Sequence, residues 1–192
     1  MAALQIVGPG MGVGVRDRYE KMVSAGEIEP DSAQRAAADR FDRLVADLTA
    51  WAPGGRGLLS RFQRKSPVSP RGVYLHGGVG RGKTMLMDLF FEAAPFQPKR
   101  RRHFHEFMAE AHERIAVARR THDGDPIPHV AHQLVGSPGL LCFDELHVTD
   151  IADAMILGRF FKVVFERQVV IVATSNAMPH ELYRHGLNRQ LF

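Results

Sequence analysis

The sequence predicts an α/β fold in which helices flank a parallel sheet, with a separate helical segment in front of it. From residue 71 onward, short apolar runs alternate with longer stretches of helical periodicity. Strands that alternate with helices form parallel sheets with right-handed crossovers. A glycine-rich loop joins the first apolar run to the first of these helical stretches. Residues 16–52, in contrast, show helical spacing.

The segment in front of the sheet is expected to hold two helices. The first ends near Gly26, and the second begins with a capping box that pairs Asp31 with Gln34. The second helix carries an apolar stripe that we expect to pack on the domain that follows. Its members are Ala37, Phe41, Leu44, Val45, Leu48 and Trp51.

These patterns divide the chain into three parts. Residues 1–15 are glycine-rich but do not form the dinucleotide pattern GxGxxG, so we interpret them as a flexible leader. Residues 16–70 hold the two helices and end in a linker rich in proline and glycine. Residues 71–192 form the core domain.

The core domain is expected to contain four strands, each followed by a helix. After the last strand, Pro179 and Gly186 delimit a short helix. The strands are expected at residues 72–76, 102–107, 140–143 and 169–173. The longer helices are expected from residue 83 to about 93, from the second strand to about 120, and from 149–150 to 167.

Size and composition fit a globular protein of the cytoplasm. The chain has 192 residues, enough for one domain with an appendage, and no apolar run approaches the length of about 18 residues that a membrane span needs. The single cysteine excludes an intramolecular disulfide and is typical of a reducing compartment. The formal charge of +4 permits contact with nucleic acid, although a solvated basic surface is the commoner case.

The glycine-rich loop carries the first chemical signal. It fits the pattern GxxxxGK[ST]. It also lies between a predicted strand and a predicted helix, a context that supports a phosphate-binding loop over an ordinary glycine turn. Glycines let backbone N–H groups close around phosphates, and the helix adds its positive dipole end. Lys83 would reach the β- and γ-phosphates, and the Thr84 hydroxyl would ligate Mg²⁺. The complete loop is Gly77, Gly78, Val79, Gly80, Arg81, Gly82, Lys83 and Thr84.

An acidic pair follows the third predicted strand. Asp144 and Glu145 come directly after the apolar run 140–143, so we expect them at the carboxyl edge of the sheet. There Asp144 could hold Mg²⁺ through its water shell. Glu145 could act as the base that activates water for attack on the γ-phosphate. The pair therefore predicts hydrolysis rather than phosphoryl transfer to a small substrate.

A third strand end completes the pattern. The apolar run 169–173 leads into Thr174, Ser175 and Asn176. Asn176 is placed to hydrogen-bond the γ-phosphate or the attacking water, and we interpret it as a sensor of the bound nucleotide.

The order of these three elements is similar to that of AAA+ ATPase cores, and wider stretches of sequence narrow the resemblance. The most particular of them are HFHEFM, FDELHVTDIADAMIL and YRHGLNRQLF. With these stretches, the chain from about residue 19 to 192 resembles the AFG-type ATPase family.

This resemblance implies an AAA+ fold and an ATP hydrolase with ATP and Mg²⁺ as its cofactors. It implies that residues 77–84 bind phosphates, that Thr84 and Asp144 hold Mg²⁺, and that Glu145 and Asn176 serve hydrolysis. A bacterial family member associates in the cytoplasm with the tubulin-like division GTPase FtsZ. Mitochondrial relatives take part in inner-membrane protein quality control.

The resemblance also implies a homo-oligomeric ring with shared sites. In such a ring, an arginine of one subunit commonly reaches the γ-phosphate bound by its neighbour. A guanidinium there neutralises charge in the transition state, an effect of roughly 10³–10⁵ in rate in related enzymes. Arg189 is the first candidate for this arginine, and Arg184 is the second.

AAA+ cores of this kind usually continue with a fifth strand and a small helical lid. This chain stops at Phe192, before both, so we expect a C-terminal edge strand and lid to be absent. A sheet without its edge strand exposes apolar surface and unpaired backbone groups. We therefore expect the chain to be poorly stable and weak or inactive as an ATPase, while it retains nucleotide binding.

Three other features are interpreted as structural. His103, His105 and His112 have no cysteine or carboxylate at a spacing that would complete a metal site, so we expect no metal besides Mg²⁺. The basic run 99–102 is interpreted as a solvated loop, with a contact to a partner or polynucleotide as the alternative. Cys142 is expected to be a packing residue and not a nucleophile.

The leading functional hypothesis is an ATPase that acts on a protein partner, above all the FtsZ ring of dividing bacteria. The main alternative is a DNA-associated AAA+ protein such as a helicase loader, whose ATPase would respond to single-stranded DNA and weaken steeply with salt. A membrane-protein quality-control ATPase also stays open. So does a nucleotide-binding adaptor without hydrolysis, although Glu145 and Asn176 argue against it.

Overall fold

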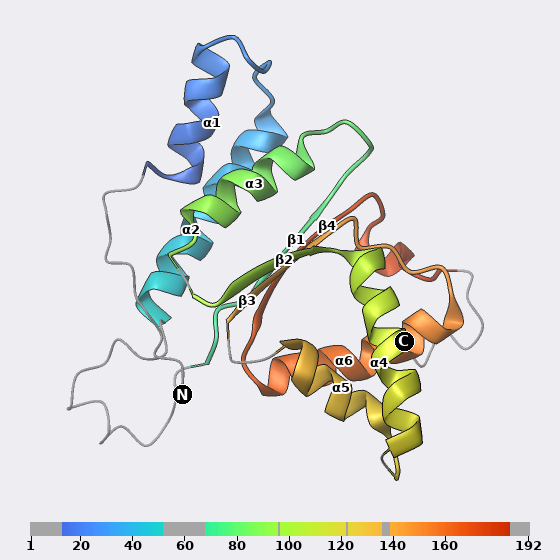
Figure 1. Ribbon diagram of the computed structural model, residues 1–192. Coiled ribbons are helices and arrows are strands. Elements are labelled where there is room, and N and C mark those ends of the chain that lie inside the picture. The colour runs from blue at the N-terminus through green and yellow to red at the C-terminus, as the bar shows by residue number, and fades with distance from the viewer. Residues whose placement is uncertain (1–12, 52–67, 96, 122, 136–138, 185–192) are drawn as a thin grey trace, which may run out of the picture.

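A computed structural model describes residues 13–51, 68–95, 97–121, 123–135 and 139–184. Within these ranges, four strands form one sheet in the order β1-β4-β3-β2, and each neighbouring pair is parallel. The sheet lies between two groups of helices (Figure 1), as the sequence predicts. The strands are β1 (Val73–His76), β2 (Lys99–His103), β3 (Leu140–Asp144) and β4 (Val170–Ser175).

The two groups of helices cover opposite faces of the sheet (Figure 1). One face is covered by α1 (Val15–Ser24), α2 (Ser32–Trp51) and α3 (Lys83–Ala93). The other is covered by α4 (Phe104–Thr121), α5 (Pro126–Val135) and α6 (Ile151–Glu166). A short 3₁₀ helix, η2 (Pro179–Glu181), follows β4.

Strand β3 lies at the centre of both hydrophobic cores. All five of its residues are buried, and successive side chains of a strand point to opposite faces. Leu140 and Cys142 belong to the core beneath α2 and α3, whereas Leu141 and Phe143 belong to the core beneath α4, α5 and α6. This two-sided burial explains the continuous apolar run of the sequence.

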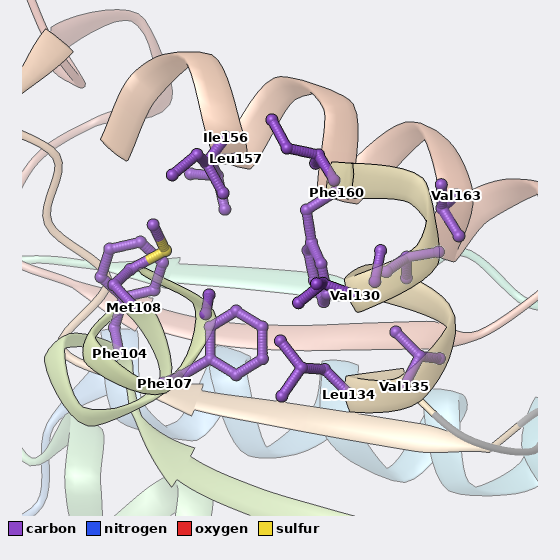
Figure 2. Close-up of a cluster of buried hydrophobic side chains, with 14 of the residues drawn as sticks. Phe104, Phe107, Met108, Val130, Leu134, Val135, Ile156, Leu157, Phe160 and Val163 are labelled. Carbon is purple, nitrogen blue, oxygen red and sulfur yellow. The ribbon is translucent and has the colours of Figure 1, made fainter. Parts of the chain in front are cut away.

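The core beneath α4 and α6 is rich in aromatic rings (Figure 2). The ring centroid of Phe107 lies 4.9 Å from that of Phe143 and 4.8 Å from that of Phe160. Phe104 meets Phe143 edge-on at 5.8 Å. Such ring pairs are worth about 0.5–1.5 kcal/mol each beyond their buried area. They hold α4 on β3, the strand that carries the acidic pair, and join α4 to α6.

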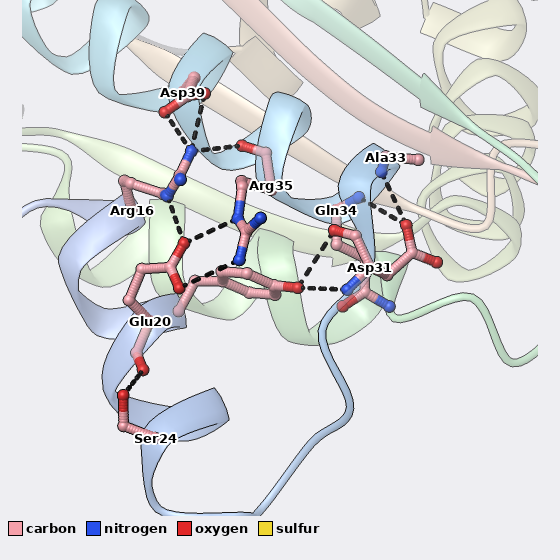
Figure 3. A network of polar contacts seen from close by, with 9 residues as sticks. Arg16, Glu20, Ser24, Asp31, Ala33, Gln34, Arg35 and Asp39 are labelled. Atoms are coloured by element: carbon pink, nitrogen blue, oxygen red, sulfur yellow. Dashed lines mark hydrogen bonds and ion pairs between the residues drawn. The ribbon is translucent and has the colours of Figure 1, made fainter.

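The N-terminal helical segment packs on α3, as its apolar stripe predicts. Phe41 of α2 stacks on Phe90 of α3 with ring centroids 4.7 Å apart. Ion pairs hold α1 on α2 (Figure 3): the Arg16 guanidinium of α1 lies 2.8 Å from the Asp39 carboxylate of α2, and the Arg35 guanidinium of α2 lies 2.9 Å from the Glu20 carboxylate of α1. These exposed pairs contribute little free energy, so the stability of the segment comes mainly from its buried stripe.

The capping box at the start of α2 is only half formed. Asp31 Oδ1 accepts the backbone N–H groups of Ala33 at 2.7 Å and Gln34 at 3.1 Å (Figure 3). These bonds lower the pKa of Asp31, and the bond from the Gln34 N–H has the larger effect. The return bond from the Gln34 side chain is replaced, because its Nε2 donates to the backbone oxygen of Arg81 at 3.2 Å. The start of α2 is thereby joined to the glycine-rich loop.

The predicted position of β2 is wrong. We predicted a strand at residues 102–107, but the strand is Lys99–His103 and α4 begins at Phe104. The basic run 99–102, interpreted as a solvated loop, is therefore most of the strand itself. A polar edge strand forms here because β3 supplies its hydrogen-bonding partner and nearby groups neutralise its charges. Arg102, for example, pairs with Glu110 of α4 at 2.7 Å.

Helix α5 is not predicted by the sequence patterns. Its buried face consists of Pro126, Ile127, Val130, Ala131, Leu134 and Val135. The prolines at positions 126 and 128 resemble helix breakers, but both lie in the first turn, where no backbone N–H is needed for the helical ladder. Asp125 Oδ1 accepts the backbone N–H of Ile127 at 3.1 Å.

The remaining core elements are confirmed with end shifts of one or two residues. Pro179 begins η2 as predicted, whereas Gly186 lies outside the described residues. So do most of the predicted leader and of the linker that ends at residue 70. In the part of the chain that the structure describes, β1 pairs only with β4, and an apolar groove of about 460 Å³ lies beside β1 and α6.

Gly72, directly before β1, has no room for a side chain. A Cβ atom there would lie 1.7 Å from the backbone oxygen of Ile171. We expect Gly72→Ala to lower the free energy of unfolding by about 1–3 kcal/mol, measured by urea denaturation. Gly158→Ala in α6 is the control, because nothing lies within 4 Å of its Cβ position. Alanine should stabilise that helix by about 0.5–1 kcal/mol. Equal effects of the two variants would contradict the close approach of β1 to β4.

Candidate nucleotide-binding site

The glycine-rich loop runs from the end of β1 to the start of α3, the context that the sequence predicts. Gly80 has φ = +73° and Gly82 has φ = +75°, a left-handed conformation that residues with a Cβ rarely adopt. A Cβ at position 82 would also come within 2.7 Å of the Gln34 side-chain nitrogen. Gly82 caps α3, so the loop leads directly into the N-terminus of that helix. The backbone therefore has the form that binds phosphates.

Lys83 extends its side chain over this loop. Its Nζ atom donates to the backbone oxygen of Gly77 at 2.8 Å and of Gly78 at 2.7 Å. Burial lowers the pKa of Lys83, and the negative charge of Glu145 acts in the opposite direction. The ammonium group is thus held inside the loop, where the charge of the Glu145 carboxylate acts on it.

Asp144 ends β3 as a buried carboxylate, 5% exposed. Arg101 of β2 binds both of its oxygens: Nε lies 2.5 Å from Oδ2 and Nη2 lies 3.2 Å from Oδ1. The same guanidinium contacts the Asp88 carboxylate of α3. This pairing compensates the cost of burying the charge and fixes the Asp144 side chain in place.

Glu145 differs from its neighbour in both backbone and exposure. Its φ angle is +56°, which is strained for a residue with a side chain. The conformation is held because the Glu145 N–H donates to Thr174 Oγ1 at 3.0 Å and the Leu146 N–H donates to the Thr174 backbone oxygen at 2.7 Å. The sharp turn leaves Glu145 exposed while Asp144 stays buried. The two carboxylates can therefore serve different chemical roles.

The end of β4 connects the loop to the acidic pair. The backbone oxygen of Ser175 accepts the Gly77 N–H at 3.2 Å, and its hydroxyl donates to the Leu146 backbone oxygen at 2.7 Å. Asn176 follows as an exposed residue at the same edge. Three adjacent strands, β1, β4 and β3, thus bring the loop, Asn176 and the acidic pair together, as the sequence predicts.

The predicted magnesium ligands suit the ion. Thr84 is an exposed residue in the first turn of α3, and Asp144 offers carboxylate oxygens at the end of β3. Mg²⁺ takes few ligands from a protein and completes its shell with water and phosphate oxygens, so one hydroxyl and one carboxylate are a fitting donor set. Within the described ranges, no group of three or more histidine, cysteine or acidic side chains is suited to another metal.

The predicted arginines are placed only in part. Arg184 is exposed shortly after η2, and its N–H donates to the Glu181 backbone oxygen at 3.1 Å. Arg189 lies outside the described residues. Sequence reasoning missed the contacts of Arg101, Thr174 and Gln34 with the site. A parallel register that sets Arg101 opposite Cys142, two residues before Asp144, is the signal that could have found the first of them.

Cys142 behaves as the packing residue that we predicted. It is fully buried, and burial raises the pKa of its thiol to about 12. We expect the thiol of the folded chain to resist iodoacetamide near neutral pH, because only the thiolate reacts, and to react after denaturation in guanidinium chloride. Mass spectrometry measures the extent of labelling. Rapid labelling of the folded chain would contradict its placement in the core.

Comparison with known proteins assigns the chain to a family. The family model described as AFG1-like ATPase matches residues 13–192. The chain belongs to the AFG1-like ATPase family. It is 41% identical over 187 residues to the cell division protein ZapE of Escherichia coli K12, an alignment that covers 91% of this chain and 49% of ZapE. This AFG1-like chain therefore spans about half the length of that relative.

A second relative and two solved structures extend the comparison. The chain is 44% identical over 139 residues to lactation elevated protein 1 homolog B of Danio rerio, covering 68% of this chain and 28% of that protein. The DnaI structure is similar with a TM-score of 0.54 and 19% identity, covering 86% of this chain and 77% of DnaI. The structure of AMPPCP-bound DnaA from Aquifex aeolicus is similar with a TM-score of 0.51 and 15% identity, covering 93% of this chain and 46% of the DnaA chain. These likenesses show that the AFG1-like chain has the P-loop AAA+ fold.

Proposed function

We propose that the chain binds ATP with Mg²⁺ and carries the groups that hydrolyse it. One observation supports this most strongly: the glycine-rich loop that leads to Lys83 follows β1, and the buried Asp144 and exposed Glu145 lie at the end of β3, with only β4 between the two strands. Family membership supports the same reaction class. The glycine-rich loop would enclose the phosphates with its N–H groups. The Lys83 ammonium, which now donates to the backbone oxygens of Gly77 and Gly78, would donate to phosphate oxygens instead.

Thr84 and Asp144 would hold the metal ion. Bound Mg²⁺ neutralises charge on the β- and γ-phosphates. The chain contributes a hydroxyl at the start of α3 and a carboxylate that β3 fixes in place. Burial keeps Asp144 from swinging into solvent, so its oxygen stays at the distance from the loop that the sheet sets.

Glu145 would act as the general base. Its exposed carboxylate takes a proton from water while the water oxygen bonds to the γ-phosphorus, and the bond from that phosphorus to the bridging oxygen of ADP breaks. The strained turn at Glu145 fixes where this side chain points. Asn176, one strand away, would hydrogen-bond the γ-phosphate or the water.

The proposed partner is the FtsZ division ring, and the proposed compartment is the cytoplasm. The 41% identity to a protein named for cell division supports this choice. In the ranges that the structure describes, no helix combines the length and apolarity needed to cross a membrane.

The test of the partner uses Glu145→Gln, which would keep ATP unhydrolysed. We expect this variant to co-sediment with FtsZ filaments in the presence of ATP and Mg²⁺, and not without ATP. Single-stranded DNA is tested in parallel by the same method. Binding to DNA alone would favour the helicase-loader alternative, whereas binding to neither would remove the division role and leave the ATPase proposal standing.

A ring with shared sites is also proposed, with Arg189, or else Arg184, acting on the γ-phosphate of a neighbouring subunit. Mixing Arg189→Ala and Lys83→Ala subunits tests it. If sites are shared, the mixture should hydrolyse ATP faster than either variant alone, because some sites combine an intact loop with an intact arginine. A mixture no faster than its components would exclude Arg189 from this role, and the same pairing would then be repeated with Arg184→Ala.

A further inference from the structure

Arg101 makes a charge contact that the proposed mechanism does not use. It lies on β2 opposite Cys142, and its guanidinium reaches along the sheet to Asp144, the proposed metal ligand. Both oxygens of that carboxylate are bound. The side chain of Arg101 is 20% exposed and that of Asp144 is 7% exposed, so water screens this contact only weakly.

The second partner of Arg101 has a different environment. Asp88 projects from the second turn of α3, and its side chain is 51% exposed. Arg101 thus bridges one buried and one solvated carboxylate. A guanidinium can bind two carboxylates because its five N–H donors lie in a rigid fork. If its contact with Asp144 loosens, Arg101 still has Asp88 as a partner.

A divalent cation near Asp144 would meet the positive charge of Arg101. Like charges a few ångströms apart repel, more strongly at a site shielded from water. The guanidinium also compensates the buried Asp144 charge when no cation is present. A metal ion bound by Asp144 would therefore compete with Arg101 for one carboxylate.

We propose that Arg101 is a positioning residue for the magnesium site. Without metal it neutralises the charge of Asp144, and it opposes the binding of a metal ion to that carboxylate. When a metal ion binds Asp144, the guanidinium stays paired with Asp88. This inference rests on the proposed function, since it takes Asp144 to be a metal ligand. Its consequence is that Arg101 lowers the coupling between metal and nucleotide binding.

The test measures that coupling with AMPPCP and Mn²⁺ as probes. Calorimetry gives the Kd of AMPPCP in EDTA and in Mn²⁺. The metal coupling is the Kd in EDTA divided by the Kd in Mn²⁺, so a larger ratio means that the metal strengthens nucleotide binding more. In Arg101→Met we expect the ratio to rise about tenfold, because the competing charge is gone. In EDTA without nucleotide, the same variant should unfold at a lower temperature than the wild type, because Asp144 is then buried without a counter-charge.

Three further variants separate competition from a general loss of structure. Arg100→Met removes the same charge from the next residue, whose guanidinium donates to the Leu134 backbone oxygen at 3.0 Å, and should leave the ratio unchanged. Arg101→Lys keeps the charge and should restore a ratio near the wild-type value. Among the described residues, Asp88→Asn leaves Asp144 as the only carboxylate that pairs with Arg101, and it should lower the ratio.

The outcomes distinguish this inference from the function on which it rests. If the folded wild type binds no AMPPCP in either buffer, the proposed function and the inference both fail. If the wild type shows metal coupling but Arg101→Met shows the same or a lower ratio, only the inference fails. Should Arg101→Met not fold, Asp88→Asn decides, and an unchanged or higher ratio in that variant overturns the competition.

Discussion

Replacing Lys83 with alanine is expected to raise the Kd of ATP about 100-fold or more. The ammonium lies inside the glycine-rich loop, bound to the backbone oxygens of Gly77 and Gly78. The variant loses charge-assisted hydrogen bonds to phosphate, worth about 1.5–3 kcal/mol each. Calorimetric titration with AMPPCP and Mg²⁺ measures the effect without the complication of hydrolysis.

Lys162→Ala is the matched control for this prediction. Lys162 is an exposed lysine of α6, on the face of the sheet away from α3. Its removal changes the net charge equally and should leave the Kd of AMPPCP unchanged. If Lys83→Ala is folded by circular dichroism and binds AMPPCP within threefold of the wild type, the role given to Lys83 is wrong.

Replacing Glu145 with glutamine should slow ATP hydrolysis by about 10²–10⁴-fold, the usual contribution of a general base. Glutamine has the same shape and leaves the bonds of the Glu145 N–H and of Leu146 to Thr174 in place. Binding of AMPPCP should therefore stay within a few fold of the wild type. Phosphate release is measured with protein in excess of ATP, so that slow single turnovers are detected.

The control for this variant is Glu166→Gln. Glu166 is an exposed carboxylate at the end of α6 and should leave both hydrolysis and binding unchanged. If the wild-type chain hydrolyses ATP at a measurable rate, an equal rate for Glu145→Gln would remove Glu145 as the base. A parallel loss of AMPPCP binding would mean that Glu145 serves the loop rather than the water.

Much of the candidate site could be predicted because its signals are local. Residues 77–84 follow a fixed pattern, and Asp144, Glu145 and Asn176 each come directly after an apolar run. In a parallel sheet, such strand ends meet at one edge. Three local sequence patterns and one rule of sheet topology were therefore enough to predict that these residues lie at the same edge of the sheet.

Strand β2 and Arg101 could not be found in this way. The strand reads KRRRH, which lacks the apolar alternation that marks a strand in sequence. It exists because β3 pairs with it and because Ala94, Asp144 and Glu110 receive its charged side chains. These are tertiary contacts between residues far apart in the sequence, and no local window contains them.

Gln34 shows the same limit on a smaller scale. The pattern from Asp31 to Gln34 predicts a capping box, and the Asp31 half of it forms. The Gln34 side chain instead bonds the Arg81 backbone oxygen, because α2 packs against α3 and the glycine-rich loop lies within its reach. A local rule identified the start of the helix but not the tertiary partner that replaced half of its cap.

The most direct test of the account is a calorimetric titration of this chain with AMPPCP in the presence of Mg²⁺, beside the Lys83→Ala variant. The account predicts saturable binding with one nucleotide per chain, weakened in EDTA and lost in the variant. Absence of binding by folded wild-type chain, or equal binding by Lys83→Ala, would contradict the claim that residues 77–84 form a nucleotide site.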